Sequence, residues 1–392
     1  MAIEVRQIVN RTELEQCYDI WGSVFPEERA FFQERLDYDR SYQLETTWIA
    51  AVDGVIASAM QIFPYVARYG IAQLRVGGIG SVATLPEYRH RGLAQMILCE
   101  QISWMRSAGY DLSLLFTGIP SFYARLGWQA FRDGESYRLG STSIREIGED
   151  CYVIRCGALA EDLPSIVAIY DEYSEWVSFS HVRPLRFWED SAKWSRHANP
   201  SIWIAERAGV PVGYLLAISN QEGQATIVEC AYRSQAEGAA GALLKVFWNE
   251  RSDKKSITLR LPSDHALAQY GEKIFEESGA MWRGFDPVRL LDRVTPELNR
   301  RWQLAGRIQF PSVGLGIGTN QMLRVRTDDA GVCIENMGSS HFVADTSCFL
   351  SSAEFLDMFL GGVELESRAA NHALLAQLFP SRTPWLWGID HF

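Results

Sequence analysis

The sequence predicts an α/β (α+β) protein with two related units followed by a smaller third domain. Three observations lead to this fold class. Extended and helical segments alternate over residues 47–126, the same order returns over residues 202–261, and the residue pattern changes near residue 289. A chain of 392 residues has room for about two to four domains. We expect the domains to span residues 1–150, 151–290 and 291–392.

In the first unit, Asp53-Gly54 is a dipeptide that favours a tight hairpin turn between two strands. A later segment places Leu93, Ile97 and Met105 on one helical face, and Gly109 follows where a helix commonly ends. The sequence of this unit therefore predicts an antiparallel meander closed by a β-helix-β crossover. The expected elements are strands at 47–52, 55–63, 74–84 and 112–116, a helix at 93–108 and a short helix at 121–126.

The second unit repeats this order. A shift of 155 residues places Trp48 on Trp203 and Gly54 on Gly209. We expect strands at 202–206, 212–218, 225–231 and 256–261, with a helix at 239–251. Two related units explain the repeat economically. The alternative is that two unrelated α/β domains share this order by chance.

The last hundred residues predict short strands and two amphipathic helices, at 353–360 and 368–379. Ser351 or Ser352 is a suitable N-cap for the first of these helices. The chain then ends with two tryptophans and Phe392, whereas a free terminus is usually polar. We therefore expect the C-terminal tail to be docked on the protein.

The composition limits the function classes. There are 37 Lys and Arg against 48 Asp and Glu, a net charge of −11. This balance argues against nucleic-acid or anionic-membrane partners, which require clustered cations. We recognise neither a signal peptide nor an apolar run long enough to cross a membrane, so we expect a soluble, cytoplasmic protein. The seven cysteines contain no C-x-x-C pair and the histidines show no ligand spacing, so we expect no metal site.

The segment 82–94 carries the strongest chemical signal, because a strand, a cationic loop and a glycine precede a long helix. Backbone N–H groups at a helix start carry partial positive charge, and Gly92 lets a diphosphate approach them closely. Arg89, Gly92 and Ala94 fit the pattern Arg/Gln-x-x-Gly-x-Gly/Ala. The alternative is a capped surface helix with basic residues. The segment predicts a cradle for a diphosphate.

With the segment Ser121-Phe122-Tyr123-Ala124-Arg125-Leu126-Gly127-Trp128, this loop resembles the GNAT superfamily of acyl-CoA-dependent N-acetyltransferases. The resemblance implies acetyl-CoA as acyl donor and Tyr123 as the general acid that protonates the departing thiolate. A core tyrosine is the alternative reading of Tyr123. The residues implied in acetyl-CoA binding are Val82, Ala83, Thr84, Arg89, His90, Arg91, Gly92, Leu93, Ala94, Gln95, Gly118 and Ile119.

In the second unit, residues 235–240 keep the bare Gln-x-x-Gly-x-Ala spacing. Glu237 stands there in place of the cationic Arg91 and would repel a diphosphate. We therefore interpret this unit as a degenerate copy of the first.

Across its whole length the chain resembles the Eis-type (enhanced intracellular survival) acetyltransferases. That resemblance implies tandem GNAT folds, with mixed, mostly antiparallel sheets, and a C-terminal domain like sterol carrier proteins. It also implies a homo-oligomer, with a hexamer as the expectation. The terminal carboxylate of Phe392 would return to the first unit and act as the general base for the attacking amine. The alternative is that the aromatic tail only fastens the terminus to the body.

For the acceptor amine we look to aromatic and acidic residues near the first helix and the terminus: Trp21, Phe25, Glu27, Glu28 and Asp390. Carboxylates over an open cleft would favour a polycationic substrate, although an exposed helix face is the alternative for Glu27 and Glu28. The resemblance points to aminoglycosides, other polyamine-like amines or lysine side chains. Two rival functions remain: a non-catalytic acyl-CoA sensor or lipid carrier, and a transferase of a longer acyl group.

Overall fold

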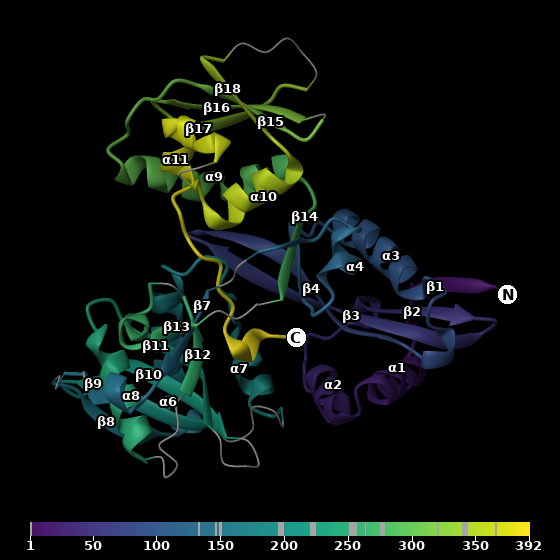
Figure 1. The fold of residues 1–392 in the computed structure, drawn as a ribbon, viewed down its shortest axis with the longest axis horizontal. Helices are drawn as coiled ribbons and strands as arrows, with labels where there is room; N and C mark the ends of the chain where they lie inside the picture. The colour runs from purple at the N-terminus through teal and green to yellow at the C-terminus, as the bar shows by residue number, and fades with distance from the viewer. Residues whose placement is uncertain are drawn as a thin grey trace.

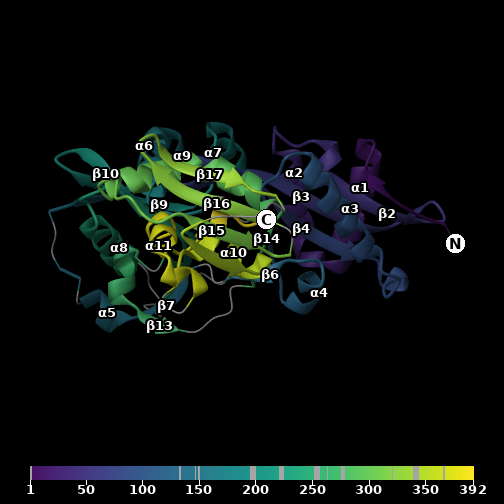
Figure 2. The same ribbon diagram turned by 90° about the horizontal axis from the view of Figure 1, so that it is seen from above.

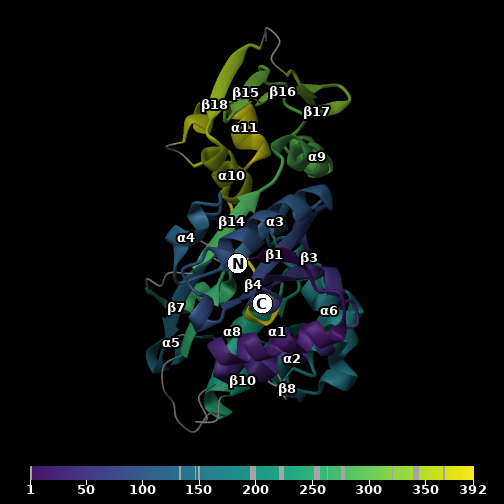
Figure 3. The ribbon, with the colours of Figure 1, turned by 90° about the vertical axis from the view of Figure 1, so that its right-hand side faces the viewer.

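The computed structural model describes residues 2–131, 134–145, 147–148, 151–194, 200–219, 225–250, 257–262, 264–274, 279–319, 321–338, 344–364 and 367–392. The chain forms three units, and the C-terminal tail runs from the third unit down between the other two (Figure 1). The terminus lies beside β4 (Ala72–Thr84) in all three views (Figures 1, 2 and 3). Residues 149 and 150, at the predicted border of the first domain, lie outside the described residues.

The first unit is built on a seven-stranded sheet in the order β1-β2-β3-β4-β5-β14-β6. Helices α1 and α2 cover one face and α3 covers the other (Figures 1 and 3). The bounds are β1 (Ile3–Gln7), α1 (Arg11–Val24), α2 (Arg29–Asp37), β2 (Thr47–Val52), β3 (Val55–Tyr69), α3 (Leu93–Ser107), β5 (Leu112–Phe116), α4 (Pro120–Ala124), β6 (Gln129–Ala130) and β14 (Ala280–Gly284).

The predicted hairpin is present: Asp53 and Gly54 both have positive φ, 48° and 86°, between β2 and β3. This is the backbone that a two-residue turn with the twist of its strands requires. The second unit has the same turn at Ala208 and Gly209, with φ of 53° and 75°. The 155-residue repeat therefore holds at the level of backbone conformation.

The second unit has two sheets, in the orders β11-β10-β9-β8 and β12-β7-β13. Its buried aromatic and aliphatic residues form one continuous core around α6 and α8. The bounds are β7 (Glu135–Leu139), α5 (Ser141–Arg145), β8 (Val153–Gly157), α6 (Leu159–Ser174), α7 (Leu185–Ser191), β9 (Ser201–Arg207), β10 (Val210–Ser219), β11 (Ala225–Tyr232), α8 (Gly238–Glu250), β12 (Ile257–Leu261) and β13 (Glu272–Ile274).

The first two units exchange a strand in each direction. Strand β7 comes before residue 150 but lies between β12 and β13 of the second unit. Strand β14 comes near the end of the second unit's sequence but lies between β5 and β6 of the first. Each sheet is therefore completed by the other unit's sequence, so the sheets do not separate at a single point in the chain. Non-local pairing of this kind leaves no periodic signal in the sequence.

The third unit is a four-stranded sheet in the order β17-β16-β15-β18, in which β15 and β18 are parallel. The predicted cap is confirmed: Ser351 and Glu354 form a reciprocal capping box at the start of α10. Where one helix was expected at 368–379, a 3-10 turn (Arg368–Asn371) precedes a shorter helix. The bounds are α9 (Pro287–Leu304), β15 (Val313–Ile317), β16 (Gln321–Asp328), β17 (Gly331–Asn336), β18 (Thr346–Leu350), α10 (Ser352–Gly361) and α11 (Ala373–Leu378).

The tail is docked, as the sequence predicts. Trp385, Trp387 and Ile389 are buried in the core of the second unit. The ring of Phe392 then packs against the first unit. The tail thus crosses from one unit to the other. Within the described residues, no helix is long and apolar enough to cross a membrane.

Candidate active site

A cavity of about 880 Å³ opens where β4 and β5 separate. The two strands pair in parallel only over residues 76–79 and 112–115. Past that point β4 continues to Thr84 and β5 leads into the loop at Gly118. The strands therefore leave a wedge between them, and residues from both strands line the cavity.

The predicted phosphate cradle forms one end of this cavity. Gly92 is the N-cap of α3 and has φ of 76°, a left-handed conformation that costs glycine little. The first intrahelical bond is from Met96 N–H to Gly92 O, so the preceding N–H groups have no partner within the helix. Arg89 donates from Nε to Thr84 O at 3.2 Å, which ties the loop to the end of β4. Backbone amides and the Arg89 guanidinium group thus lie where a diphosphate would bind.

Tyr123 lies on α4 and lines the same cavity. Its side chain is 6% exposed, and its ring packs edge-on against Phe122 and Trp128. Burial raises the pKa of Tyr123 to about 12, because the charged form loses solvation. The hydroxyl is therefore protonated at neutral pH, the state in which it can donate a proton.

Phe392 also lines the cavity. Its ring stacks on Phe63, with centroids 5.5 Å apart, and lies against Phe116 at 5.7 Å. A Cβ built on Gly78 would lie 2.4 Å from the Phe392 ring, and one on Gly80 would lie 3.3 Å from the terminal carboxyl carbon. These two glycines of β4 therefore make room for the terminal residue.

Asp390 fastens the tail before it reaches the cavity. Its carboxylate accepts from Arg183 Nε and Nη2 at 2.7 and 2.6 Å, and His181 Nδ1 lies 3.0 Å from Oδ1. Burial alone would raise the pKa of Asp390, but Arg183 and His181 lower it well below its ordinary value. Arg183 also forms a buried ion pair with Glu229 on β11. The second unit thus holds the tail two residues from its end.

The structure brings most of the predicted acetyl-CoA residues together. All except Arg91 line the cavity, as do Phe25, Glu28, Tyr123 and Phe392. Arg91 instead donates to Glu87 O at 3.1 Å and lies over the Tyr88 ring.

Three of the residues predicted to bind the acceptor lie elsewhere. Trp21 is fully buried on the inner face of α1 and donates from Nε1 to Ala59 O. Glu27 is exposed and does not line the cavity. Asp390 is committed to the buried ion pair with Arg183. The structure therefore does not place these three at the cavity between β4 and β5.

The position at which Phe392 packs was not predicted from the sequence. Its signal was present in the run Val76-Gly77-Gly78-Ile79-Gly80, because glycines inside a strand often mark the close approach of another group. Phe63 and Phe116, which contact the terminal ring, were not predicted either. Nothing in their local sequence distinguishes them from ordinary core aromatic residues.

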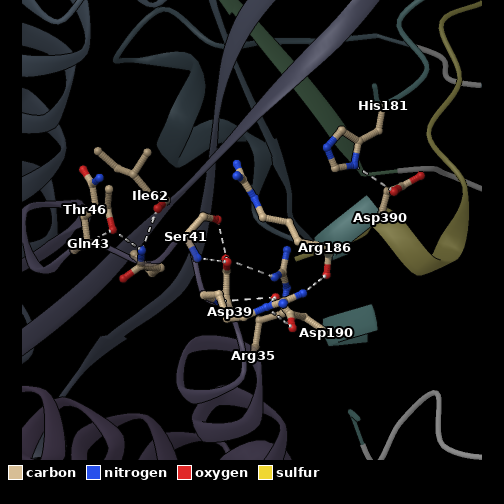
Figure 4. A network of polar contacts seen from close by, with 12 residues as sticks. Arg35, Asp39, Ser41, Gln43, Thr46, Ile62, His181, Arg186, Asp190 and Asp390 are labelled. Atoms are coloured by element: carbon tan, nitrogen blue, oxygen red, sulfur yellow. Dashed lines mark hydrogen bonds and ion pairs between the residues drawn. The ribbon is translucent and has the colours of Figure 1, made fainter. Parts of the chain in front are cut away.

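A second cavity, of about 430 Å³, shares Phe392 with the first. Residues of α2, the edge of β3, the segment 181–187 and the tail line it. Its polar side chains come from both units (Figure 4). Among the residues the structure describes, no group of three or more His, Cys, Asp or Glu side chains is placed to hold a metal ion.

Residues 4–131 match the family described as the acetyltransferase (GNAT) domain. The chain therefore carries a GNAT acetyltransferase domain, and this domain contains both the cradle and Tyr123. An uncharacterized N-acetyltransferase of Streptomyces coelicolor is 28% identical over 104 residues, which are 26% of this chain and 25% of that protein. The chain thus covers about a quarter of the length of this curated relative.

Solved structures resemble the whole chain. A probable N-acyltransferase of Enterococcus faecalis has a TM-score of 0.78 at 15% identity, and a GCN5-related N-acetyltransferase of Anabaena variabilis has 0.75 at 14%. Eis1 of Mycobacterium abscessus has 0.68 at 15%. Each comparison covers 100% of both chains. At these identities the likeness is one of fold, and it extends over all three units.

Proposed function

We propose that the protein transfers the acetyl group of acetyl-CoA directly to the amino group of an acceptor. One observation carries this proposal: the cradle at Gly92, the Tyr123 side chain and the terminal residue Phe392 line a single cavity. A non-catalytic carrier of acyl-CoA would need the cradle but neither a proton donor nor a base. Donor, acid and base in one cavity are what acyl transfer to an amine requires.

In the proposed reaction, the cradle binds the diphosphate of acetyl-CoA and the pantetheine arm follows residues 82–84 of β4. A β-bulge at Ser81 and Val82, where two residues oppose one on β3, leaves backbone groups unpaired at this point. Unpaired N–H groups on this strand would stabilise the oxyanion that develops on the thioester carbonyl.

The proton movements involve the chain's own groups. The amine nitrogen forms a bond to the carbonyl carbon, and its proton passes to the Phe392 carboxylate directly or through water. The carbon–sulfur bond then breaks, and the Tyr123 hydroxyl gives its proton to the departing thiolate. The Phe392 carboxyl group then releases its proton to solvent, and solvent returns a proton to Tyr123. Because the amine attacks the thioester directly, no covalent enzyme intermediate is needed.

On the acceptor side, Phe25, Phe31 and Phe32 make the cavity wall largely aromatic, and Glu28 contributes a carboxylate. Such a wall accommodates an amine with an apolar body. Aminoglycosides, other polyamine-like amines and lysine side chains are the acceptor classes that the resemblance to Eis-type acetyltransferases implies, and they form the first panel to be tested.

The experiment is release of free thiol from acetyl-CoA with that panel, for wild type, Tyr123→Phe and Tyr38→Phe. Tyr38 is 41% exposed and does not line the cavity, so it is the matched control. We expect Tyr123→Phe to lower kcat about a hundredfold and Tyr38→Phe to leave it unchanged. Equal rates for the two variants would remove Tyr123 from the mechanism. No turnover by wild type on any amine would overturn the proposal.

The Eis-type resemblance also leads us to propose a third unit related to sterol carrier proteins and a hexameric assembly. Sedimentation equilibrium of the full chain tests the assembly, and a monomer at micromolar concentration would contradict it.

A further inference from the structure

The second cavity has no part in the reaction proposed above, yet Phe392 lines both cavities. It exists because the edge of the first sheet is interrupted. Strand β2 pairs with β3 only as far as Gln61. Further along the same edge, Val66 and Arg68 bond to the segment 179–182. Within the described residues, no strand covers this edge of β3 between those two points.

Local side chains adapt the exposed edge to this interruption. Gln61 Nε2 donates to Ile62 O at 2.6 Å, which satisfies a carbonyl at the end of the β2 pairing. The residue after Phe63 is Pro64, which has no N–H to leave unpaired. Figure 4 shows Ile62 bonded on one side of the network and Arg35, Asp39 and Arg186 on the other. Gln61 and Pro64 therefore compensate for the missing strand pairing at this edge.

Arg35 is the most unusual group in this cavity. It is 8% exposed, and its guanidinium group lies 4.2 Å from the Trp194 ring and 5.1 Å from the Phe63 ring. It forms no hydrogen bond with any described residue, and its closest carboxylate oxygen, Asp39 Oδ2, is 3.8 Å from Nη1. Buried guanidinium groups are normally hydrogen-bonded. Aromatic rings pack against it, and its buried Nε has no hydrogen-bond partner among the described residues.

Tyr65 adds a second buried donor to the lining. Its hydroxyl is shielded from solvent and has no hydrogen-bond partner among the described residues. The Tyr65 ring lies edge-on to His181 at 5.4 Å and 6.2 Å from the Phe392 ring. Two donors without partners, in a cavity that touches the terminal residue, indicate an acceptor group on the molecule that binds there.

The buried carboxylates of the cavity, Asp190 and Asp390, and the half-buried Asp39 already have partners. Asp39 accepts from Ser41 N, Asp190 from Arg40 and Lys193, and Asp390 from Arg183. Glu45 and Arg186 are exposed, so water screens their charges. The unmet hydrogen-bonding capacity of the buried lining therefore belongs to donors, at Arg35 and Tyr65.

We infer that this cavity binds a carboxylate on the acceptor, with Arg35 and Tyr65 donating to it, so that the acceptor is an amino acid. This inference rests on the proposed function and narrows its substrate class. A carboxylate is planar and singly charged, so it suits the free edge of one guanidinium group. A phosphate dianion would add charge beside Asp39, Asp190 and Asp390. A polycation would leave both donors unpaired.

The amine and the carboxylate of such an acceptor share one carbon, so both would lie near Phe63. Phe63 contacts the Arg35 guanidinium on one side and stacks on the Phe392 ring at 5.5 Å. Phe63 thus lies beside both a carboxylate donor and the terminal residue that would take the amine proton. Phe187 and Trp194, which also line the cavity, would favour an apolar or aromatic side chain on the amino acid.

The test compares amines that differ only by a carboxylate: phenylalanine with phenethylamine, and tryptophan with tryptamine. Thiol release gives kcat/KM for each. Calorimetry with the products, N-acetylphenylalanine and N-acetylphenethylamine, measures binding without turnover. We expect the wild type to favour the carboxylate member by about ten- to a hundredfold in both measurements, the range for a charge-assisted hydrogen bond.

Tyr65→Phe is the sharpest variant, because it removes one oxygen that has no partner within the described fold. If the hydroxyl were merely structural, its loss would leave both members of a pair unaffected. We expect KM for phenylalanine to rise severalfold while KM for phenethylamine and kcat stay the same. Arg35→Met, which keeps the apolar stem, should abolish the preference. The wild-type comparison stands even if Arg35→Met fails to fold.

The outcomes separate this inference from the proposed function. If the wild type acetylates phenethylamine as well as phenylalanine, the carboxylate site is overturned and the acetyltransferase proposal stands. If nothing is acetylated but N-acetylphenylalanine binds in an Arg35-dependent way, the carboxylate site is supported and the proposed reaction fails. If neither turnover nor selective binding occurs, both are overturned.

Discussion

The substitution Asp390→Asn tests how the tail is held. Asp390 and Arg183 are both fully buried, and two hydrogen bonds of 2.7 and 2.6 Å join them. Removing one partner of a buried ion pair typically costs about 3 to 5 kcal/mol. Arg183 keeps its ion pair with Glu229, and asparagine keeps one acceptor oxygen. We therefore expect the lower end, a loss of roughly 3 kcal/mol in the free energy of unfolding.

The same change should loosen Phe392 two residues later. We expect kcat to fall about tenfold or more, because a small displacement of a catalytic group has a large effect on rate. KM for acetyl-CoA should not change, because Asp390 is not among the residues that line the cavity with the cradle at Gly92. Urea unfolding gives the stability, and thiol release gives kcat and KM separately.

Asp171→Asn is the matched control. Asp171 pairs with Arg68 at 2.8 Å but is 46% exposed, so its loss should cost less than about 1 kcal/mol and leave kcat unchanged. If Asp390→Asn unfolds like the control and keeps wild-type kcat, the reasoning that the buried pair positions the terminus is refuted.

Three further predictions follow from single groups. Gly92→Ala places a side chain at φ of 76°, so KM for acetyl-CoA should rise severalfold. Gly140→Ala, which has open space and no positive φ, should leave KM unchanged. Steady-state kinetics of both variants tests this difference. Gly80→Ala would bring a Cβ within 2.9 Å of Phe63 and 3.3 Å of the terminal carboxyl carbon. We therefore expect kcat to fall while calorimetry still shows acetyl-CoA binding. An unchanged kcat would contradict this placement of Phe392. Burial lowers the pKa of His265 to about 4, and its neutral ring accepts from Leu267 N–H and bonds to Cys230 O. The unfolded chain therefore binds one more proton than the folded chain between pH 6.5 and 4, and the free energy of unfolding should fall by roughly 3 kcal/mol as the pH drops through that window. Urea unfolding at pH 7 and pH 4 should show a smaller loss of stability for His265→Gln than for the wild type. An equal loss in the two proteins would exclude His265 as the cause.

Local features of the fold could be predicted from the sequence because a few residues determine them. The turn at Asp53-Gly54, the strand at 112–116 and the cap at Ser351 all depend on neighbouring residues, and all are confirmed. The strand exchange of β7 and β14 could not be predicted, because either strand carries the same pattern whichever sheet it completes. Pairing partners far apart in the sequence depend on the whole fold.

In the candidate site, too, local motifs could be predicted from the sequence and contacts between distant segments could not. The cradle and Tyr123 belong to one continuous segment, so the spacing of their residues along the chain is enough to recognise them. The second cavity is assembled from α2, β3, the segment 181–187 and the tail, and residue types alone do not show which side chains face it. Trp21 and Glu27 were predicted from their types, but Trp21 faces the core from α1 and Glu27 is exposed in the 3-10 turn that follows. Arg35 could not be predicted from its neighbours, because its burial depends on Trp194, far along the chain.

The central claim is that the carboxylate of Phe392 takes the proton from the acceptor amine. The most direct measurement is kcat for a chain extended by one alanine after Phe392, with acetyl-CoA affinity measured alongside. The extension converts the carboxylate at this position into a neutral amide and moves the charge by about 3.5 Å. We predict a loss of at least about a hundredfold in kcat with unchanged acetyl-CoA binding. An extended chain with wild-type kcat would contradict the account.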